Sequence, residues 1–328
     1  MEKVFIDANT LLDFYRYGQD DIDEIGKVVH LINENELQLF TTQLLMDEVY
    51  RMREAELSRV LAELRNQAPQ IKVPTFVKTF DEYTELTSKL KLANAEHGKL
   101  IARINELVEK RMLEADKLLA ILFKEAKLLK TGKKVMNAAK QRNILNNPPR
   151  KKGDSMSDAL HWEALLREEG VIMLHLVSKD GDFASELSPN HIKRFLHEEW
   201  IEKKNEYATV HLYKNLSSFF KARFPDIVLS AEVEKADLIS QLYLSSSFQE
   251  THEVVAELSK HTSFTTGQAA RLFEALWINN QVYWIAKDDD VNNFFRSLQA
   301  KSFGVPNEIQ ADIAKYLGVK KDDFFLPF

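Results

Sequence analysis

The sequence GVIMLHLVSKDGDF, residues 170–183, contains a near-continuous apolar run from Val171 to Val177 that is followed closely by two aspartates, Asp180 and Asp182. A strand that is hydrophobic on both faces is typical of a parallel sheet covered by helices on both sides. We therefore expect a buried parallel strand that carries these two acids at its carboxyl end.

Three other segments have the same strand-like character. KVFID, residues 3–7, predicts a short buried strand that ends on an aspartate, and LQLFTT, residues 37–42, predicts a second one. YATVHLY, residues 207–213, predicts a further strand. Helical patterns follow these segments, and such alternation indicates a parallel sheet with helices on both faces. The predicted fold class is therefore α/β, a three-layer sandwich around a central parallel sheet.

Two other regions have helical patterns. Between about residues 79 and 147, apolar residues recur at three- and four-residue steps, which predicts a long helix or a helical hairpin. From residue 229 to the end, three helix-length patterns precede QVYWIA, residues 281–286, which resembles a short strand. We predict one domain over residues 1–228 with a helical insertion at about 79–147. A helical accessory domain, for which a winged-helix-like arrangement is one option, would follow over residues 229–328.

The composition describes a globular protein and limits its chemistry. Of the 328 residues, 45% are hydrophobic and 29% charged, and the formal net charge is -6. Because the chain has no cysteine, disulfides and thiolate zinc sites are excluded. The start, MEKVFIDANTLL, has no export-signal pattern, and the apolar runs are too short to span a membrane. We expect a cytoplasmic protein with no membrane partner.

Acidic residues lie at the predicted carboxyl ends of strands or in the first turns of the helices that follow. They are Asp7, Glu48, Asp154, Asp158, Asp180 and Asp182. The carboxyl ends of parallel strands form one crevice, and several carboxylates there repel each other unless a cation neutralises them. An all-oxygen site selects Mg²⁺ or Mn²⁺ over zinc. Each acid also has a simpler interpretation: Asp7 and Asp154 as helix caps, Asp180 or Asp182 as turn residues, and Glu48 as a solvated acid beside the equally available Asp47.

DANT and GDSMSD, residues 7–10 and 153–158, superficially resemble the DxDxT and GDxxxD signatures of haloacid-dehalogenase-type phosphatases. The second aspartate, which is the general acid of that family, is Asn9 here. In that fold GDxxxD also follows a hydrophobic strand, whereas here it follows NNPPRKK. We set this interpretation aside.

Four segments in order carry a stronger resemblance: VFIDANTLLDFYR (4–16), LLMDEVYRMR (44–53), GDSMSDALHWEAL (153–165) and LVSKDGDF (176–183). Together they resemble PIN-domain ribonucleases, specifically the bacterial PIN-like type with a long helical insertion. The resemblance implies a Rossmann-like sandwich and a metal-dependent endoribonuclease with two ions of Mg²⁺ or Mn²⁺. Asp7, Asp158 and Asp180 would bind metal, and Glu48 would complete the cluster directly or through water. Asp154 and Asp182 would be further acids of the site.

By analogy with the family, the protein could be a toxin or an antiphage effector. Two alternatives remain open. The first is a structure-specific DNA nuclease of the related flap type. The second is a catalytically degenerate PIN scaffold that binds a protein partner. The sequence also leaves open a homodimer or a partner protein bound through the helical insertion or the C-terminal domain.

Basic residues gather in the stretch that leads into Asp154, and they predict contacts with the backbone of single-stranded or structured RNA. The predicted RNA-binding residues are Arg51, Lys133, Lys134, Arg142, Arg150, Lys151 and Lys152. Arg53 could also meet a phosphate. The alternative is a solvated helix face without a ligand.

Overall fold

The computed structural model describes residues 1–16, 22–149, 156–261 and 263–325. It divides into two compact units, which are described separately. One unit comprises Met1–Lys3, Gly26–Gln38 and Phe219–Phe328, and the other comprises Val4–Ile25 and Leu39–Ser218. The domain boundary placed between residues 228 and 229 from the sequence stays a prediction.

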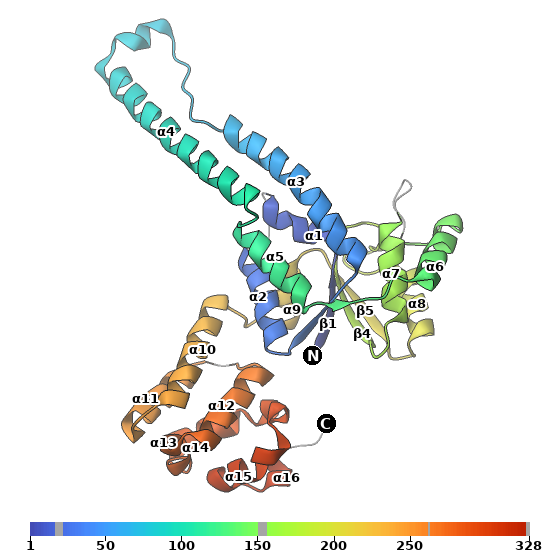
Figure 1. The fold of residues 1–328 in the computed structure, drawn as a ribbon, viewed down its shortest axis with the longest axis vertical. Coiled ribbons are helices and arrows are strands. Elements are labelled where there is room, and N and C mark those ends of the chain that lie inside the picture. The colour runs from blue at the N-terminus through green and yellow to red at the C-terminus, as the bar shows by residue number, and fades with distance from the viewer. Residues whose placement is uncertain (17–21, 150–155, 262, 326–328) are drawn as a thin grey trace. The chain divides into compact units, whose positions relative to one another are not determined.

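A five-stranded sheet in the order β3-β2-β1-β4-β5 organises the unit of residues 4–25 and 39–218 (Figure 1). The strands are β1 (Glu2–Ile6), β2 (Leu37–Thr41), β3 (Lys127–Leu128), β4 (Met173–Val177) and β5 (Thr209–Tyr213). β1 pairs with β4 in parallel, as do β4 with β5 and β2 with β3. The side chains of Leu174 to Val177 are buried, as expected for a strand that is covered on both faces. The predicted α/β fold with a central parallel sheet is confirmed.

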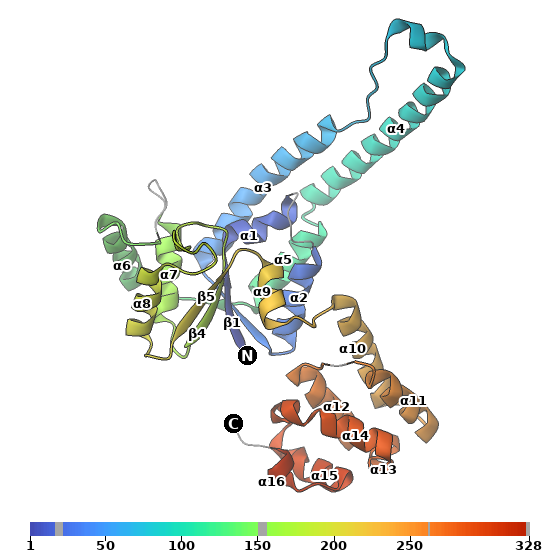
Figure 2. The same ribbon diagram turned by 180° about the vertical axis from the view of Figure 1, so that it is seen from behind.

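The helices that follow these strands begin at one edge of the sheet, where the carboxyl ends lie. Asp7 is the N-cap of α1 (Ala8–Leu12), and Thr42 is the N-cap of α3 (Gln43–Asn66). Helix α7 (Ser157–Arg167) leads back into β4. Figure 2 shows α7 grouped with α6 (Lys133–Ile144) and α8 (Arg194–Lys203) on one side of the sheet. Helix α5 (Glu114–Glu125) belongs to the same unit, whereas most of α2 (Ile22–Asn33) and of α9 (Leu216–Arg223) belongs to the other unit.

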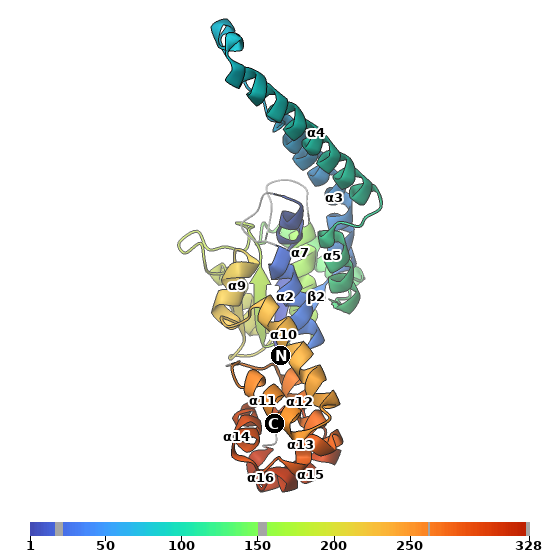
Figure 3. The same cartoon turned by 90° about the vertical axis from the view of Figure 1, so that its left-hand side faces the viewer.

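A long hairpin forms from α3 and α4 (Asp81–Glu109), and it extends away from the sheet (Figure 3). The His97 ring hydrogen-bonds the carbonyl of Leu64 at 3.0 Å, and Asn94 donates to the carbonyl of Pro69. The predicted hairpin therefore exists, but its first helix lies before residue 79. Residues 127–128, which were predicted to be helical, form β3 instead. That part of the prediction was wrong because helical periodicity cannot resolve a two-residue strand at a sheet edge.

The C-terminal region is helical, as predicted. Its helices are α10 (Leu229–Leu244), α11 (Phe248–Leu258), α12 (Thr266–Ile278), α13 (Asn280–Trp284), α14 (Asp289–Ser297), α15 (Asn307–Leu317) and α16 (Lys321–Phe324). Leu276, Phe273 and Phe295 are at the centre of its apolar core. The strand predicted at residues 281–286 is wrong: Asn279 caps α13 there by accepting a hydrogen bond from the Gln281 amide.

Because the described residues from 229 to 325 include no strand, the C-terminal region lacks the wing of a winged helix. Throughout the ranges that the structure describes, no helix has both the length and the apolar character needed to cross a membrane.

Candidate active site

Asp7 and Asp180, two of the acids predicted for the site, are connected through Ser178. The Asp7 amide donates to the Val177 carbonyl at 2.9 Å, which places the aspartate at the carboxyl ends of β1 and β4. The Asp7 carboxylate accepts hydrogen bonds from the Ala8 amide at 2.8 Å and from the Ser178 hydroxyl at 3.0 Å. The Ser178 hydroxyl also accepts from the Asp180 amide at 3.1 Å. Ser178 therefore positions one acid and the backbone of the other.

Ser178 is a residue of this site that the sequence patterns did not indicate. It is 1% exposed, and its amide donates to the Tyr213 carbonyl. The available signal was a small hydroxyl residue directly after an apolar strand, but its contact with Asp7 depends on the pairing of β1 with β4.

Asp158 is buried in the first turn of α7, three residues before His161. The two residues share a face of the helix because side chains three apart are neighbours. His161 Nδ1 hydrogen-bonds the Thr42 hydroxyl at 3.0 Å, and the His161 ring lies 5.4 Å from the ring of Phe5 in β1. These contacts hold the start of α7 against β1 and the residue that follows β2.

The other predicted acids occupy different surroundings. Glu48 is half-buried on α3, six residues beyond its N-cap, and Asp182 is half-buried in the loop after β4. Asp154 lies outside the described residues. Asp13, which sequence reasoning did not single out, is buried and forms an ion pair with Lys179, the neighbour of Asp180. This pair ties the segment after α1 to the loop that carries Asp180.

The donor chemistry of this edge suits a hard divalent cation. Asp7 and Asp158 are 4% and 5% exposed, and burying ionised carboxylates is costly unless their charge is compensated. Carboxylate oxygens are the ligands that Mg²⁺ and Mn²⁺ prefer. Within the described part of the chain, however, no three His, Asp or Glu side chains are grouped so that they could hold a metal ion. That the predicted acids coordinate a metal ion together therefore stays a prediction.

The predicted RNA-binding residues separate into three groups. Lys133 and Lys134 are exposed at the start of α6, and Arg51 is exposed on α3. Arg150, Lys151 and Lys152 lie outside the described residues.

Arg142 forms the third group, and its prediction needs correction. It is 4% exposed and bonds Glu163 at 2.7 Å and Glu199 at 2.5 Å. Because its guanidinium is engaged inside the protein, it cannot contact RNA from this position. Arg53 is likewise buried and bonds Asp116 at 2.6 Å.

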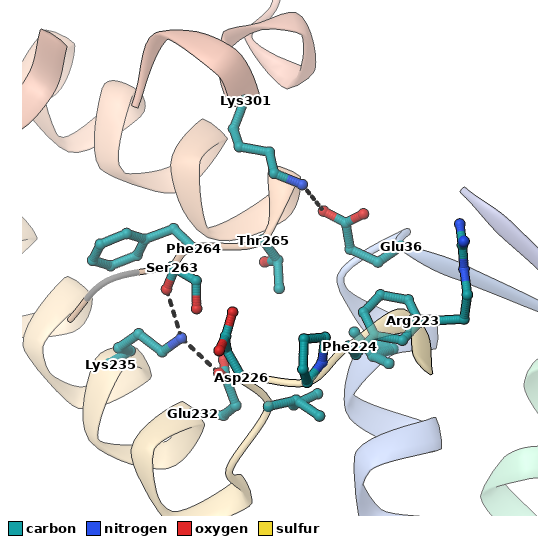
Figure 4. Close-up of a pocket in the computed structure, with 13 residues that line it drawn as sticks. Glu36, Arg223, Phe224, Asp226, Glu232, Lys235, Ser263, Phe264, Thr265 and Lys301 are labelled. Atoms are coloured by element: carbon teal, nitrogen blue, oxygen red, sulfur yellow. Dashed lines mark hydrogen bonds and ion pairs between the residues drawn. The ribbon is translucent and has the colours of Figure 1, made fainter. Parts of the chain in front are cut away.

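The other unit contains a cavity of about 240 Å³ (Figure 4). Glu232 lies buried in its wall, where Lys235 donates to it at 2.6 Å and also donates to the Ser263 carbonyl at 2.9 Å. Across the cavity Lys301 pairs with Glu36 at 3.4 Å. Burial raises the pKa of Glu232, but hydrogen bonds from His30, Lys235 and Gln268 outweigh it and lower the pKa to about 2. These oppositely charged side chains form a structural ion-pair network.

Comparison with known proteins gives one match. A family model described as a PIN domain matches residues 4–183, which is more than half of the chain and includes Asp7, Glu48, Asp158 and Asp180. No curated protein and no solved structure matches the chain. Proteins with this domain are usually nucleases and generally depend on divalent metal ions.

Proposed function

Because the chain belongs to the PIN-domain family, we propose that it is a metal-dependent endoribonuclease that hydrolyses phosphodiester bonds in RNA. The observation that carries the proposal is the bridge from Asp7 through Ser178 to Asp180. This bridge places two acids from distant parts of the sequence at the carboxyl edge of a parallel sheet, which is where ligand sites of open α/β sheets form.

In this proposal Asp7, Asp158 and Asp180 hold the divalent ions, and Glu48 contributes directly or through water. Two such ions, when bound, would supply activation of a water molecule and stabilisation of the leaving oxygen. Ser178 orients the Asp7 carboxylate, and the bond from His161 to Thr42 holds the helix that carries Asp158. Asp154 and Asp182 are the outer acids of the same site.

The test is cleavage of a mixed RNA and of a single-stranded DNA with Mn²⁺, with Mg²⁺ and with EDTA, using wild type and Asp158→Asn. Glu54→Gln is a control for the loss of one negative charge, since Glu54 is exposed on α3. We expect RNA cleavage that EDTA and Asp158→Asn abolish and that Glu54→Gln retains.

Other outcomes separate the alternatives. Cleavage that persists in EDTA or in Asp158→Asn would rule out the metal-dependent site. Cleavage of DNA in preference to RNA would make the protein a DNA nuclease. A wild-type protein inert on every nucleic acid would favour a scaffold that binds a protein partner.

We extend the proposal to a toxin or antiphage role, because uncontrolled cleavage of cellular RNA stops growth. Induced expression of wild type in bacteria should arrest growth, and expression of Asp158→Asn should not. Equal growth of both strains at equal protein levels would contradict this role.

A further inference from the structure

A basic groove lies between the start of α6 and the end of α7. Its volume is about 650 Å³, and we call it the α6–α7 groove. Its basic residues are Lys127, Lys130, Lys133, Lys134 and Arg167, and its acidic residues are Glu168 and Glu169. Five basic residues against two acidic ones make the groove positive in a chain whose net charge is -6. Such a local field, rather than the total charge, governs which ligands approach.

Three lysines of the α6–α7 groove present their charges to solvent. Lys130, Lys133 and Lys134 are exposed, and none forms an ion pair with any residue in the described ranges. The other two basic residues differ, because Lys127 pairs with Glu168 at 2.5 Å and Arg167 pairs with Glu163. An open groove with several unneutralised ammonium groups suits an extended polyanion.

The position of Lys133 and Lys134 is unfavourable for the helix itself. Both lie in the first turn of α6, which has no acidic residue. The helix dipole favours acids at this end and disfavours bases. Since local helix stability does not explain two adjacent lysines here, a ligand that carries negative charge is the better explanation.

We propose that the α6–α7 groove binds the sugar–phosphate backbone of an RNA strand whose scissile bond lies at the other end of α7. This inference rests on the proposed endoribonuclease function. Arg167 lines the groove, whereas Asp158 opens the helix. Arg167 lies nine positions after Asp158, which corresponds to about 13.5 Å along the helix axis at 1.5 Å per residue. The groove is thus a binding site separate from the carboxylates and within reach of the same strand.

The residues that line the α6–α7 groove indicate whether it recognises a particular RNA sequence. The apolar part of the groove is formed by Leu128, Val135 and Ala164, and the described lining residues include no aromatic side chain. Bases are usually held in single-strand sites by stacking on aromatic rings. Lysine contacts to phosphate position a strand without reading its sequence. The groove should therefore bind RNA of any sequence.

The test is RNA binding by Lys133→Gln/Lys134→Gln in an Asp158→Asn background, which prevents cleavage during the measurement. Affinity for a long single-stranded RNA is measured over a range of salt concentrations. Loss of two phosphate contacts should make the negative slope of log K against log salt shallower by about 1.4, at about 0.7 per phosphate for single strands. Lys89→Gln/Lys91→Gln, on the exposed surface of α4, is the control for the change of net charge and should leave the slope unchanged.

A second readout uses the cleavage-competent protein. Lys133→Gln/Lys134→Gln should cleave long RNA more slowly at low substrate concentration and cleave a trinucleotide at the wild-type rate. An unchanged salt slope, or equal loss in the control pair, would overturn the inference. A third outcome is that wild type cleaves no RNA, although substitution of the two lysines still makes the salt slope shallower. That outcome would support RNA binding in the groove and overturn the endoribonuclease proposal. The two proposals can therefore fail separately.

Discussion

Two buried acids in this protein have opposite surroundings. Glu232 is in a cavity wall and receives hydrogen bonds from Lys235 and His30. Asp7 is at the carboxyl end of β1, and the donors that bond its carboxylate include the Ala8 amide and the Ser178 hydroxyl, which are both neutral. Both residues are 4% exposed, so burial alone does not separate them.

The two residues differ in their place in the fold and in the donors described above for each carboxylate. When one partner of a buried carboxylate–ammonium pair is removed, the other is left as a costly unpaired charge. The Asp7 carboxylate is oriented by an amide and a hydroxyl at the carboxyl end of a parallel strand, which is where ligand sites of open α/β sheets form. We therefore expect substitutions at Glu232 to affect folding and substitutions at Asp7 to affect activity.

Asp7→Asn should give the largest effect. The amide keeps an oxygen that accepts from Ser178 or Ala8 but loses the charge that binds metal. Cleavage should fall at least about 100-fold, more than the roughly 10- to 100-fold loss typical of changes outside the ligand shell. Thermal unfolding should shift little. Initial cleavage rates and melting curves measured on the same preparation check this, and a large loss of stability would assign Asp7 a structural role.

Glu232→Gln should lower the stability of the fold and leave cleavage unchanged. Since folding lowers the pKa of Glu232 from 4.5 to about 2, its ionised form contributes about 3 kcal/mol to the free energy of unfolding. Urea unfolding at pH 7 should show that loss, while the cleavage rate of the folded protein should stay unchanged. Glu234→Gln, an exposed acid on the same helix, should cost less than about 0.5 kcal/mol.

The pH dependence sharpens this prediction. A depressed carboxyl pKa stabilises the folded state above the unfolded pKa and loses that contribution as pH falls through the folded pKa. Wild type should therefore lose stability between pH 4.5 and about 2, and Glu232→Gln should lose less over the same interval. Identical pH profiles for the two proteins would contradict the assigned role of the ion pair.

The sequence was sufficient for those parts of the fold that local pattern determines. The apolar run of β4 and the short strand β1 could be predicted because buried parallel strands are continuously hydrophobic. The pattern failed at residues 281–286, where Val282, Tyr283 and Trp284 favour a strand by composition. Asn279 caps a helix there, and packing in the C-terminal core outweighs the local preference.

The site could be predicted only in part, because side-chain partners depend on the fold. Nothing near Arg142 in the sequence indicates that Glu163 and Glu199 will bury and neutralise it. Within a basic run it resembles Lys133 and Lys134, which remain exposed. The contact of Ser178 with Asp7 joins residues 171 positions apart and follows only from the register of β1 and β4.

Ser178→Ala tests whether orientation by a neutral donor matters for Asp7. The substitution removes the hydroxyl that bonds the Asp7 carboxylate and the Asp180 amide. We expect cleavage to fall about tenfold, the lower end of the range for residues that orient metal ligands, with a matching rise in the Mn²⁺ concentration needed for half-maximal rate. A loss of rate that excess Mn²⁺ leaves unchanged would mean that Ser178 does not act through metal binding.

Thr42→Val should have the smallest effect and tests how α7 is held at this edge. The Thr42 hydroxyl accepts from the Leu45 amide at the start of α3 and bonds the His161 ring. Valine has nearly the same shape but no hydroxyl, and loss of an N-cap costs about 1 kcal/mol. Urea unfolding should show that loss, and Thr42→Ser should recover most of it. If Thr42→Ser is as destabilising as Thr42→Val, the methyl group rather than the hydroxyl of Thr42 holds α7 in place. The hydrogen bond to His161 would then not position Asp158.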